Sequence, residues 1–254
     1  MKKTLFAVTL IILTLSFVCT ANADMLTGGL VSGKYTTFKT TSNGNTATSY
    51  VGHMDVTNLT TNVDFQAFCG DHNTYTSSDF GNANKGQAYG AYSLWDSSLT
   101  IYTQQQKEDV NSVFGYLYGL GFDTTTGDVT DKTTAIAMQL MIWEILGDSD
   151  NGFDLYTGDF LVHTDSLSTE QKSILTKVDE YALMLVNDNW GDMIFTQYDM
   201  TVYVAEGGKH ASQTLISVEN TTTPEPASLL IFGAGLVLGA PVLRRRMKNL
   251  KNAA

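Results

Sequence analysis

The chain has 254 residues and a formal net charge of −11, with 26 acidic and 15 basic side chains. The imbalance is larger in the middle: residues 24–223 hold eight lysines, no arginine and twenty-five acidic residues, so their net charge is −17. Such a charge excludes binding to nucleic acid or to anionic lipid through this region.

The first 23 residues have the parts of a secretory signal peptide. Lys2 and Lys3 form a positive start, residues 5–18 form an apolar run, and Ala-Asn-Ala at 21–23 is a small–x–small cleavage pattern. We predict that signal peptidase cuts there and that the mature, exported chain begins at Asp24.

Three strands are predicted next. Residues 30–40, 47–59 and 63–69 are rich in Val, Tyr, Thr and Phe, which are enriched in strands. Asn43-Gly44 lies between the first two and is a strong hairpin signal, because both residues tolerate the positive φ of a tight turn. We therefore expect a hairpin, followed by a third strand that ends at Cys69.

The middle of the chain is predicted to form three helices. Their start signals are capping patterns at Thr103 with Gln106, at Asp131, and at Ser168 with Gln171. The second helix spans 132–146 and is apolar almost all round, so we expect it to be buried. The third carries the clearest amphipathic stripe, over 174–186.

Two more strands are expected at 193–204 and 213–218, from their β-branched and aromatic residues. The order of strands, helices and strands predicts one α+β domain over 24–219, a β-sandwich or barrel with a helical insertion. A polar linker follows over 220–226.

The tail has three parts in a fixed order. They are a motif of Pro224, Glu225 and Pro226, an apolar segment over 227–243 that contains glycines, and a basic cluster of Arg244, Arg245 and Arg246. This tail resembles the PEP-CTERM sorting signal of Gram-negative bacteria. The resemblance implies a single transmembrane helix within 227–254, with the arginines held in the cytoplasm. It also implies removal by an exosortase, which leaves the protein at the cell surface or outside it.

Cysteine usage draws attention to Cys69. The chain has two cysteines, and Cys19 leaves with the signal peptide. An odd cysteine in an exported protein implies an intermolecular disulfide, a free thiol or another covalent use. A lone thiol outside the cell is open to oxidation unless it is buried or consumed.

Gln139 is the second unusual residue, because it lies on the apolar helix. A buried amide without partners costs roughly 1–3 kcal/mol. An internal thioester between the Cys69 sulfur and the Gln139 side-chain carbonyl would use both groups, with Phe68 and Trp143 as shields against water. An outside nucleophile would then be joined to Gln139 and free Cys69, so the protein reacts once and is not an enzyme. The hypothesis requires the two side chains to meet.

These motifs resemble those of bacterial thioester domains, found on surface adhesins of Gram-positive cells. Phe68-Cys69 matches the family's aromatic–Cys motif, and Gln139 to Trp143 matches its Gln–x–x–apolar–Trp helix. The family's β-sandwich with a helical insertion agrees with the order of elements predicted here. Many family members have Thr before the Gln and Ala two residues after it, where this chain has Met138 and Met141.

Other candidate groups have weaker patterns. His72 and Asp71 follow Cys69 closely, and either can accept a proton from an attacking amine, although a solvated loop is the preferred interpretation. His163 can pair with Cys69 in a hydrolase, but no nucleophile signature surrounds the cysteine.

We expect no metal ion and no cofactor. The loop 148–154 is rich in Asp and resembles a calcium loop, but its glycine is misplaced and no Glu closes it, so a helix-ending turn is preferred. Tyr89, Tyr92 and Trp95 can line a glycan surface, although scattered aromatics are more often core.

Three functions follow, in order of preference. The first is covalent attachment of a surface or matrix protein to a partner that bears an amine or hydroxyl nucleophile. The second is a structural or glycan-binding matrix component without the thioester. The third is a Cys-dependent hydrolase. Signal peptidase, exosortase and the membrane are the expected partners during processing.

Overall fold

The structure is a computed structural model that describes residues 23–72, 80–82, 84–123, 128–148, 153–187, 198–206 and 212–219. The predicted signal peptide lies outside the described residues, apart from residue 23. The sorting motif, the apolar tail and the basic cluster also lie outside them. Among the described residues, no helix combines the length and the apolar character needed to cross a membrane.

Seven antiparallel strands form one sheet in the order β2-β3-β7-β6-β4-β1-β5, and β2 also pairs with β1. This extra pairing closes six of the strands into a ring, with β5 added at the far end of β1. The strands are β1 (Asp24–Ser42), β2 (Asn45–Asn58), β3 (Val63–Cys69), β4 (Gln87–Ser93), β5 (Phe160–Val162), β6 (Asp199–Ala205) and β7 (Leu215–Glu219). Of the two predicted architectures, the closed ring corresponds to the barrel.

The β1–β2 hairpin forms where the sequence predicts it. Ser42 pairs with Asn45, and the two turn residues Asn43 and Gly44 have φ of 46° and 77°. Positive φ at both central residues matches the twist of the flanking strands, so the turn fixes the register of the longest pair of strands.

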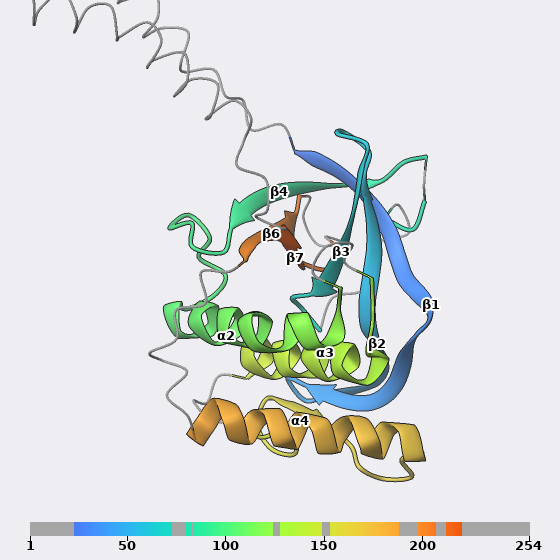
Figure 1. Cartoon of the computed structure of the whole chain (residues 1–254). Coiled ribbons are helices and arrows are strands. Elements are labelled where there is room, and N and C mark those ends of the chain that lie inside the picture. The colour runs from blue at the N-terminus through green and yellow to red at the C-terminus, as the bar shows by residue number, and fades with distance from the viewer. Residues whose placement is uncertain are drawn as a thin grey trace, which may run out of the picture.

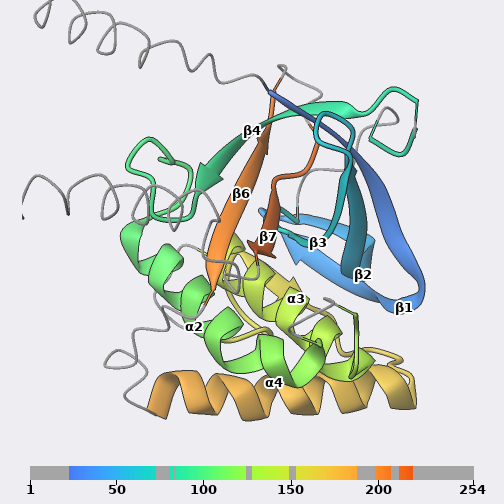
Figure 2. The same ribbon diagram turned by 45° about the horizontal axis from the view of Figure 1, so that its top comes forward.

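Three helices cover one side of the sheet (Figures 1 and 2). They are α2 (Gln104–Gly121), α3 (Lys132–Gly147) and α4 (Thr169–Asn187). All three predicted starts are confirmed. Thr103 forms the full capping box of α2 and Asp131 caps α3. Ser168 and Gln171 exchange the two capping bonds at α4. α3 packs between the other two helices and against the sheet, and its residues from 134 to 144 are buried.

Two strands were not expected from the sequence, and four begin at other residues than expected. β1 begins at Asp24 instead of residue 30, β2 begins at Asn45 instead of residue 47, and β7 begins at Leu215 instead of residue 213. β4 and β5 are additional, and β6 begins at Asp199 in the described residues, while most of the predicted segment before it lies outside them.

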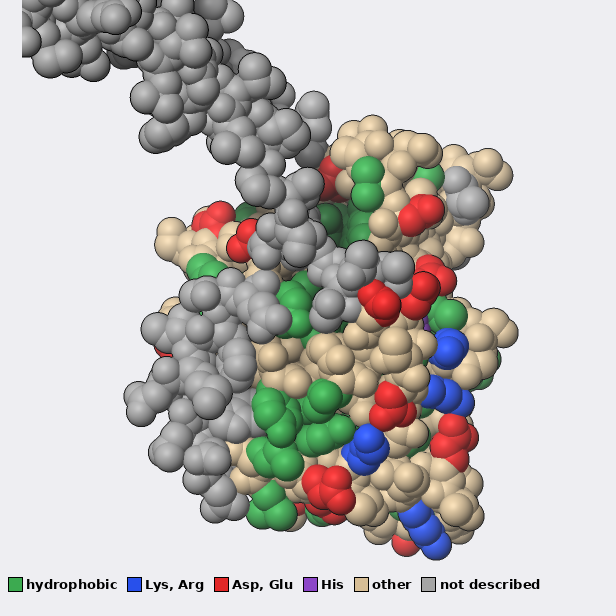
Figure 3. All heavy atoms as spheres, viewed as in Figure 1, with side chains coloured by type: hydrophobic (Ala, Val, Ile, Leu, Met, Phe, Trp, Pro, Cys, Tyr) green, Lys and Arg blue, Asp and Glu red, His purple; other side chains and the backbone are tan. Residues whose placement is uncertain are grey.

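Acidic side chains are spread over the face in Figure 3, and hydrophobic ones gather over the helices. The strand–helix–strand order of the predicted α+β domain is present, and it brings the end of β3 onto the buried helix α3.

Candidate functional site

Cys69 and Gln139 lie in contact although 70 residues separate them in the sequence. The Cys69 N–H donates to Gln139 Oε1 at 2.8 Å, and Gln139 Nε2 donates to the Cys69 carbonyl at 2.8 Å. Cys69 is 4% exposed and Gln139 is 0% exposed. The carboxamide is therefore held against the same residue whose sulfur the thioester hypothesis would join to it.

The end of strand pairing explains this contact. β7 pairs with β3 as far as Cys69, but on the other edge β2 pairs with β3 only as far as Ala67. The Gln139 carboxamide has a donor and an acceptor like a peptide group, and it takes the place of the missing strand. The need of the buried amide for partners, inferred from the sequence, is thus met by backbone groups without a bond to sulfur.

The thiol itself contacts a second glutamine. Cys69 Sγ donates to Gln213 Oε1 at 3.1 Å, and Gln213 Nε2 donates to the Asp71 carbonyl at 3.1 Å. Burial, and then the charge of Asp71, raise the pKa of the Cys69 thiol to about 12. The sulfur is therefore neutral near pH 7 and is not an activated thiolate.

The two predicted shielding residues lie in different surroundings. Phe68 is 1% exposed and packs edge-on against Phe114 and Phe122 in the core. Successive strand residues point to opposite sides. Phe68 therefore fills the core on the other side of β3 from the Cys69 sulfur and does not cover the sulfur. Trp143 is 3% exposed and packs edge-on against Phe160.

A hollow of about 300 Å³ lies next to the end of β3, and neither Cys69 nor Gln139 is among its lining residues. Its walls include the three residues after the cysteine, Gly70, Asp71 and His72, together with Tyr102 and Trp143. The Tyr102 hydroxyl donates to the Gly70 carbonyl at 3.1 Å. A Cβ on Gly70 would lie 2.5 Å from that hydroxyl oxygen, so glycine permits the close approach.

Two buried polar atoms of this hollow have no hydrogen-bond partner, Trp143 Nε1 and His72 Nδ1. The two rings pack against each other with centroids 5.4 Å apart. Burial lowers the pKa of His72, and the charge of Asp71 only partly opposes it. The imidazole is therefore neutral at pH 7 and can accept a proton. Trp143 Nε1 is therefore an unused donor, and His72 Nδ1 is an unused acceptor in the tautomer that carries its proton on Nε2.

The other sequence candidates do not join this cluster. His163 Nε2 hydrogen-bonds Thr41 Oγ1 at 2.8 Å and is not among the hydrogen-bond partners of Cys69. Of the Asp-rich loop 148–154, for which a helix-ending turn was preferred to a calcium site, residues 149–152 lie outside the described part. Its Asp154 accepts a hydrogen bond from the Tyr156 N–H in a turn. Within the described residues, no group of three His, Cys, Asp or Glu side chains is arranged to hold a metal ion.

The three aromatic residues weighed as a glycan surface separate in the structure. Tyr89 is fully buried, Trp95 is 49% exposed, and Tyr92 lines a second, larger hollow. The core interpretation therefore holds for Tyr89, and the three residues do not form one surface.

Comparison with known proteins gives a distant structural likeness only. No family model and no curated protein matches the chain. The N-terminal domain of the Streptococcus pyogenes pilus tip adhesin Cpa is similar at 14% identity, covering 80% of this chain and 96% of that one, with a TM-score of 0.46. The N-terminal thioester domain of fibronectin-binding protein SfbI from the same species is similar at 15% identity, with 80% and 96% covered and a TM-score of 0.44.

A third similar structure is the N-terminal thioester domain of a protein F2-like fibronectin-binding protein from Streptococcus pneumoniae. The identity is 14%, the coverage is 77% of this chain and 99% of that one, and the TM-score is 0.42. At such distances the functional inference depends on the residues of this chain.

Proposed function

We propose that this is an exported surface protein that attaches covalently to a partner through an internal thioester between Cys69 and Gln139. The observation that supports it is the pair of hydrogen bonds between the Gln139 carboxamide and the Cys69 backbone. They hold the carbonyl carbon of the side chain beside the residue that carries the sulfur. Rotation of the Cys69 side chain away from Gln213 is the movement that the reaction requires.

The chemistry balances without a cofactor. In the first step the Cys69 sulfur bonds to the Gln139 Cδ, the C–N bond breaks, and the thiol proton leaves with the amide nitrogen as ammonia. In the second step an amine or hydroxyl of the partner bonds to the same Cδ, the C–S bond breaks, and the sulfur regains a proton. The product is an amide or ester that joins the partner to Gln139, and the protein does not turn over.

Burial suits a bond that must survive until a partner arrives. The nearly complete burial of both residues excludes water from the carbonyl. The raised pKa of the Cys69 thiol makes its thiolate an unfavourable leaving group. A thioester here would hydrolyse slowly, and a catalysed capture would need a proton donor for the departing sulfur.

The hollow next to the end of β3 offers a path for the incoming nucleophile. His72 is neutral and its Nδ1 is unused, so it can take the proton of an attacking amine and return one to the Cys69 sulfur. Asp71 provides a carboxylate that favours a cationic group such as a lysine side chain.

A second acyl donor must be weighed, because the thiol is hydrogen-bonded to Gln213 and not to Gln139. A Cys69–Gln213 thioester would show the same loss of ammonia. We favour Gln139, because its carboxamide is fully buried whereas Gln213 is only half-buried, and an exposed thioester would hydrolyse.

Intact mass of the purified protein tests the proposal. The bond lowers the mass by one ammonia, and methylamine then adds its full mass to the thioester. Gln139→Ala and Cys69→Ala should both remove the deficit, while Gln213→Ala should keep it. A deficit that is lost only in Gln213→Ala and Cys69→Ala would show that the thioester is formed with Gln213. A full mass with a titratable thiol would exclude a thioester with either glutamine.

Processing at both ends is part of the same proposal. The signal peptide pattern at 1–23 and the tail with Pro224, Glu225 and Pro226 support export by signal peptidase and sorting by an exosortase. Mass spectrometry of the native protein should find a mature chain that begins at Asp24 and ends near the motif. Both termini intact would contradict it.

A further inference from the structure

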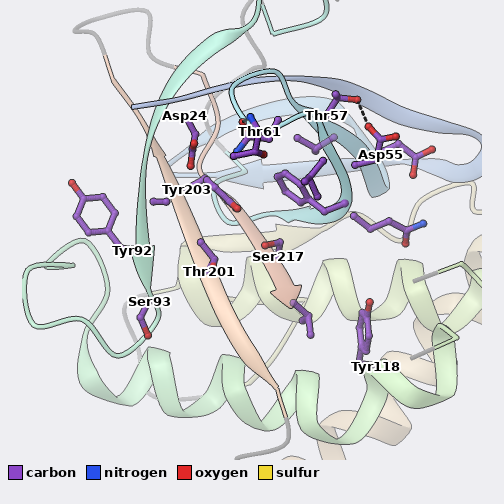
Figure 4. Close-up of a pocket in the computed structure, with 18 residues that line it drawn as sticks. Asp24, Asp55, Thr57, Thr61, Tyr92, Ser93, Tyr118, Thr201, Tyr203 and Ser217 are labelled. Carbon is purple, nitrogen blue, oxygen red and sulfur yellow. Dashed lines mark hydrogen bonds between the residues drawn. The ribbon is translucent and has the colours of Figure 1, made fainter. Parts of the chain in front are cut away.

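A larger hollow, of about 1030 Å³, shares no lining residue with the one beside Cys69. All six strands of the closed ring contribute to its walls, and Tyr118 of α2 closes one side (Figure 4). The mouths of β-barrels are frequent ligand sites, because several strands can present side chains to one space.

The charge of the lining excludes an anionic ligand. Three carboxylates line the hollow, those of Asp24, Asp55 and Asp64, and no Lys, Arg or His is among the lining residues. Burial raises the pKa of Asp55, and the charges of Asp128 and Asp64 raise it further, as expected where the local potential is negative. Phosphate, sulfate or uronic acid groups would be repelled.

Short polar side chains supply hydrogen-bonding groups on opposite walls. Thr201 on β6 lies directly opposite Ser217 on β7, so both side chains point to the same side of the sheet. On the other wall Thr57 Oγ1 donates to Asp64 Oδ1 at 2.7 Å (Figure 4). Gln66 is another lining residue, and its Oε1 is a buried acceptor without a partner.

The hollow also has an apolar surface. Phe65 of β3 stacks on Tyr203 of β6, with ring centroids 5.2 Å apart and planes at 22°. Phe65 is only partly buried. A ring that keeps part of its surface open provides apolar contact area next to the hydroxyls, amide and carboxylates.

We propose that this hollow binds a glycan without negative charge, a chain of neutral or amine-bearing sugars. Sugars combine many hydroxyl groups with apolar C–H faces, which matches the hydroxyl groups of Thr201 and Ser217 on the same side of the sheet as the partly exposed Phe65 ring. This binding does not use Cys69 or Gln139, so it is independent of the thioester. It would hold the protein on a polysaccharide non-covalently.

Retention of the purified exported protein on insoluble polysaccharides tests the proposal. Cellulose and chitin are neutral probes, chitosan is an amine-bearing probe, and alginate is an anionic one. We expect retention on at least one of the first three and none on alginate. Gln66→Ala and Phe65→Ala should each weaken binding roughly tenfold, as expected for one lost hydrogen bond or ring contact.

The controls separate this site from folding and from the thioester. Asp55→Asn should weaken binding to chitosan more than to cellulose, whereas Asp165→Asn, at an exposed position between β5 and α4, should change neither. Phe65→Ala can also loosen packing on Tyr203, so Gln66→Ala with an unchanged melting temperature is the decisive variant. Cys69→Ala should bind normally. Retention on none of the neutral or amine-bearing probes, or full retention by Gln66→Ala, overturns the proposal.

Discussion

Replacing Gln139 by Ala measures how much the carboxamide contributes to the fold when no thioester is possible. The change is made in a Cys69→Ala background, because alanine at that position retains the backbone N–H and C=O that Gln139 contacts. The substitution of Gln139 leaves both of these groups unsatisfied in a buried site. At roughly 1–3 kcal/mol for each group, the free energy of unfolding should fall by about 2–6 kcal/mol.

Urea unfolding followed by tryptophan fluorescence measures this difference. The matched control is Gln213→Ala in the same background. It removes one hydrogen bond, to the carbonyl of Asp71, from a half-buried residue, so its cost should be about 1 kcal/mol or less. A loss below about 1 kcal/mol for Gln139→Ala, or a loss equal to that of the control, would refute the role of the carboxamide as a substitute strand.

Three other predictions concern acid, the hairpin and capture. Burial and then the charge of Lys34 lower the pKa of His53 to about 4. Between about pH 6.5 and 4 the unfolded state therefore binds more protons than the folded state. The free energy of unfolding should fall by roughly 2–3 kcal/mol as the pH is lowered through this range. His53→Phe should remove that slope in urea titrations, and a slope that persists would show that another group causes it. Gly44→Ala should lower stability by about 1 kcal/mol, because Ala is strained at φ 77°, and an unchanged melting temperature would contradict this. The rate of capture is measured with an amine that stays neutral across the pH range. In the wild-type protein the rate should rise with pH, with a midpoint below 6.5, and in His72→Gln it should be slower and independent of pH. An identical pH profile in the variant would exclude His72 from proton transfer.

Local signals in the sequence were sufficient for the hairpin and the helix starts. Asn43-Gly44, Thr103 and Asp131 each act through neighbours within a few residues, so their geometry can be read from a short segment. β5 has three residues, which is too short for an alternating pattern. β4 carries Gly90 in its centre, and glycine weakens a strand pattern.

The partners at the candidate site depend on pairings that no local pattern contains. Cys69 and Gln139 were linked from their chemistry and from a family resemblance, and the fold does bring them into contact. Gln213 was missed, because a polar residue before a strand has no distinctive signal. Its contact with the thiol arises only when β7 pairs with β3 at Cys69 and Leu215. The closure of the sheet, which forms the larger hollow, is likewise a property of the whole fold.

Intact-mass analysis of the freshly purified protein, with and without methylamine, measures whether the thioester is present. A bond between Cys69 and Gln139 gives a mass deficit of one ammonia, which methylamine converts to a gain at a peptide that contains Gln139. A protein of full mass, with a Cys69 thiol that titrates after unfolding and no methylamine adduct, would contradict it.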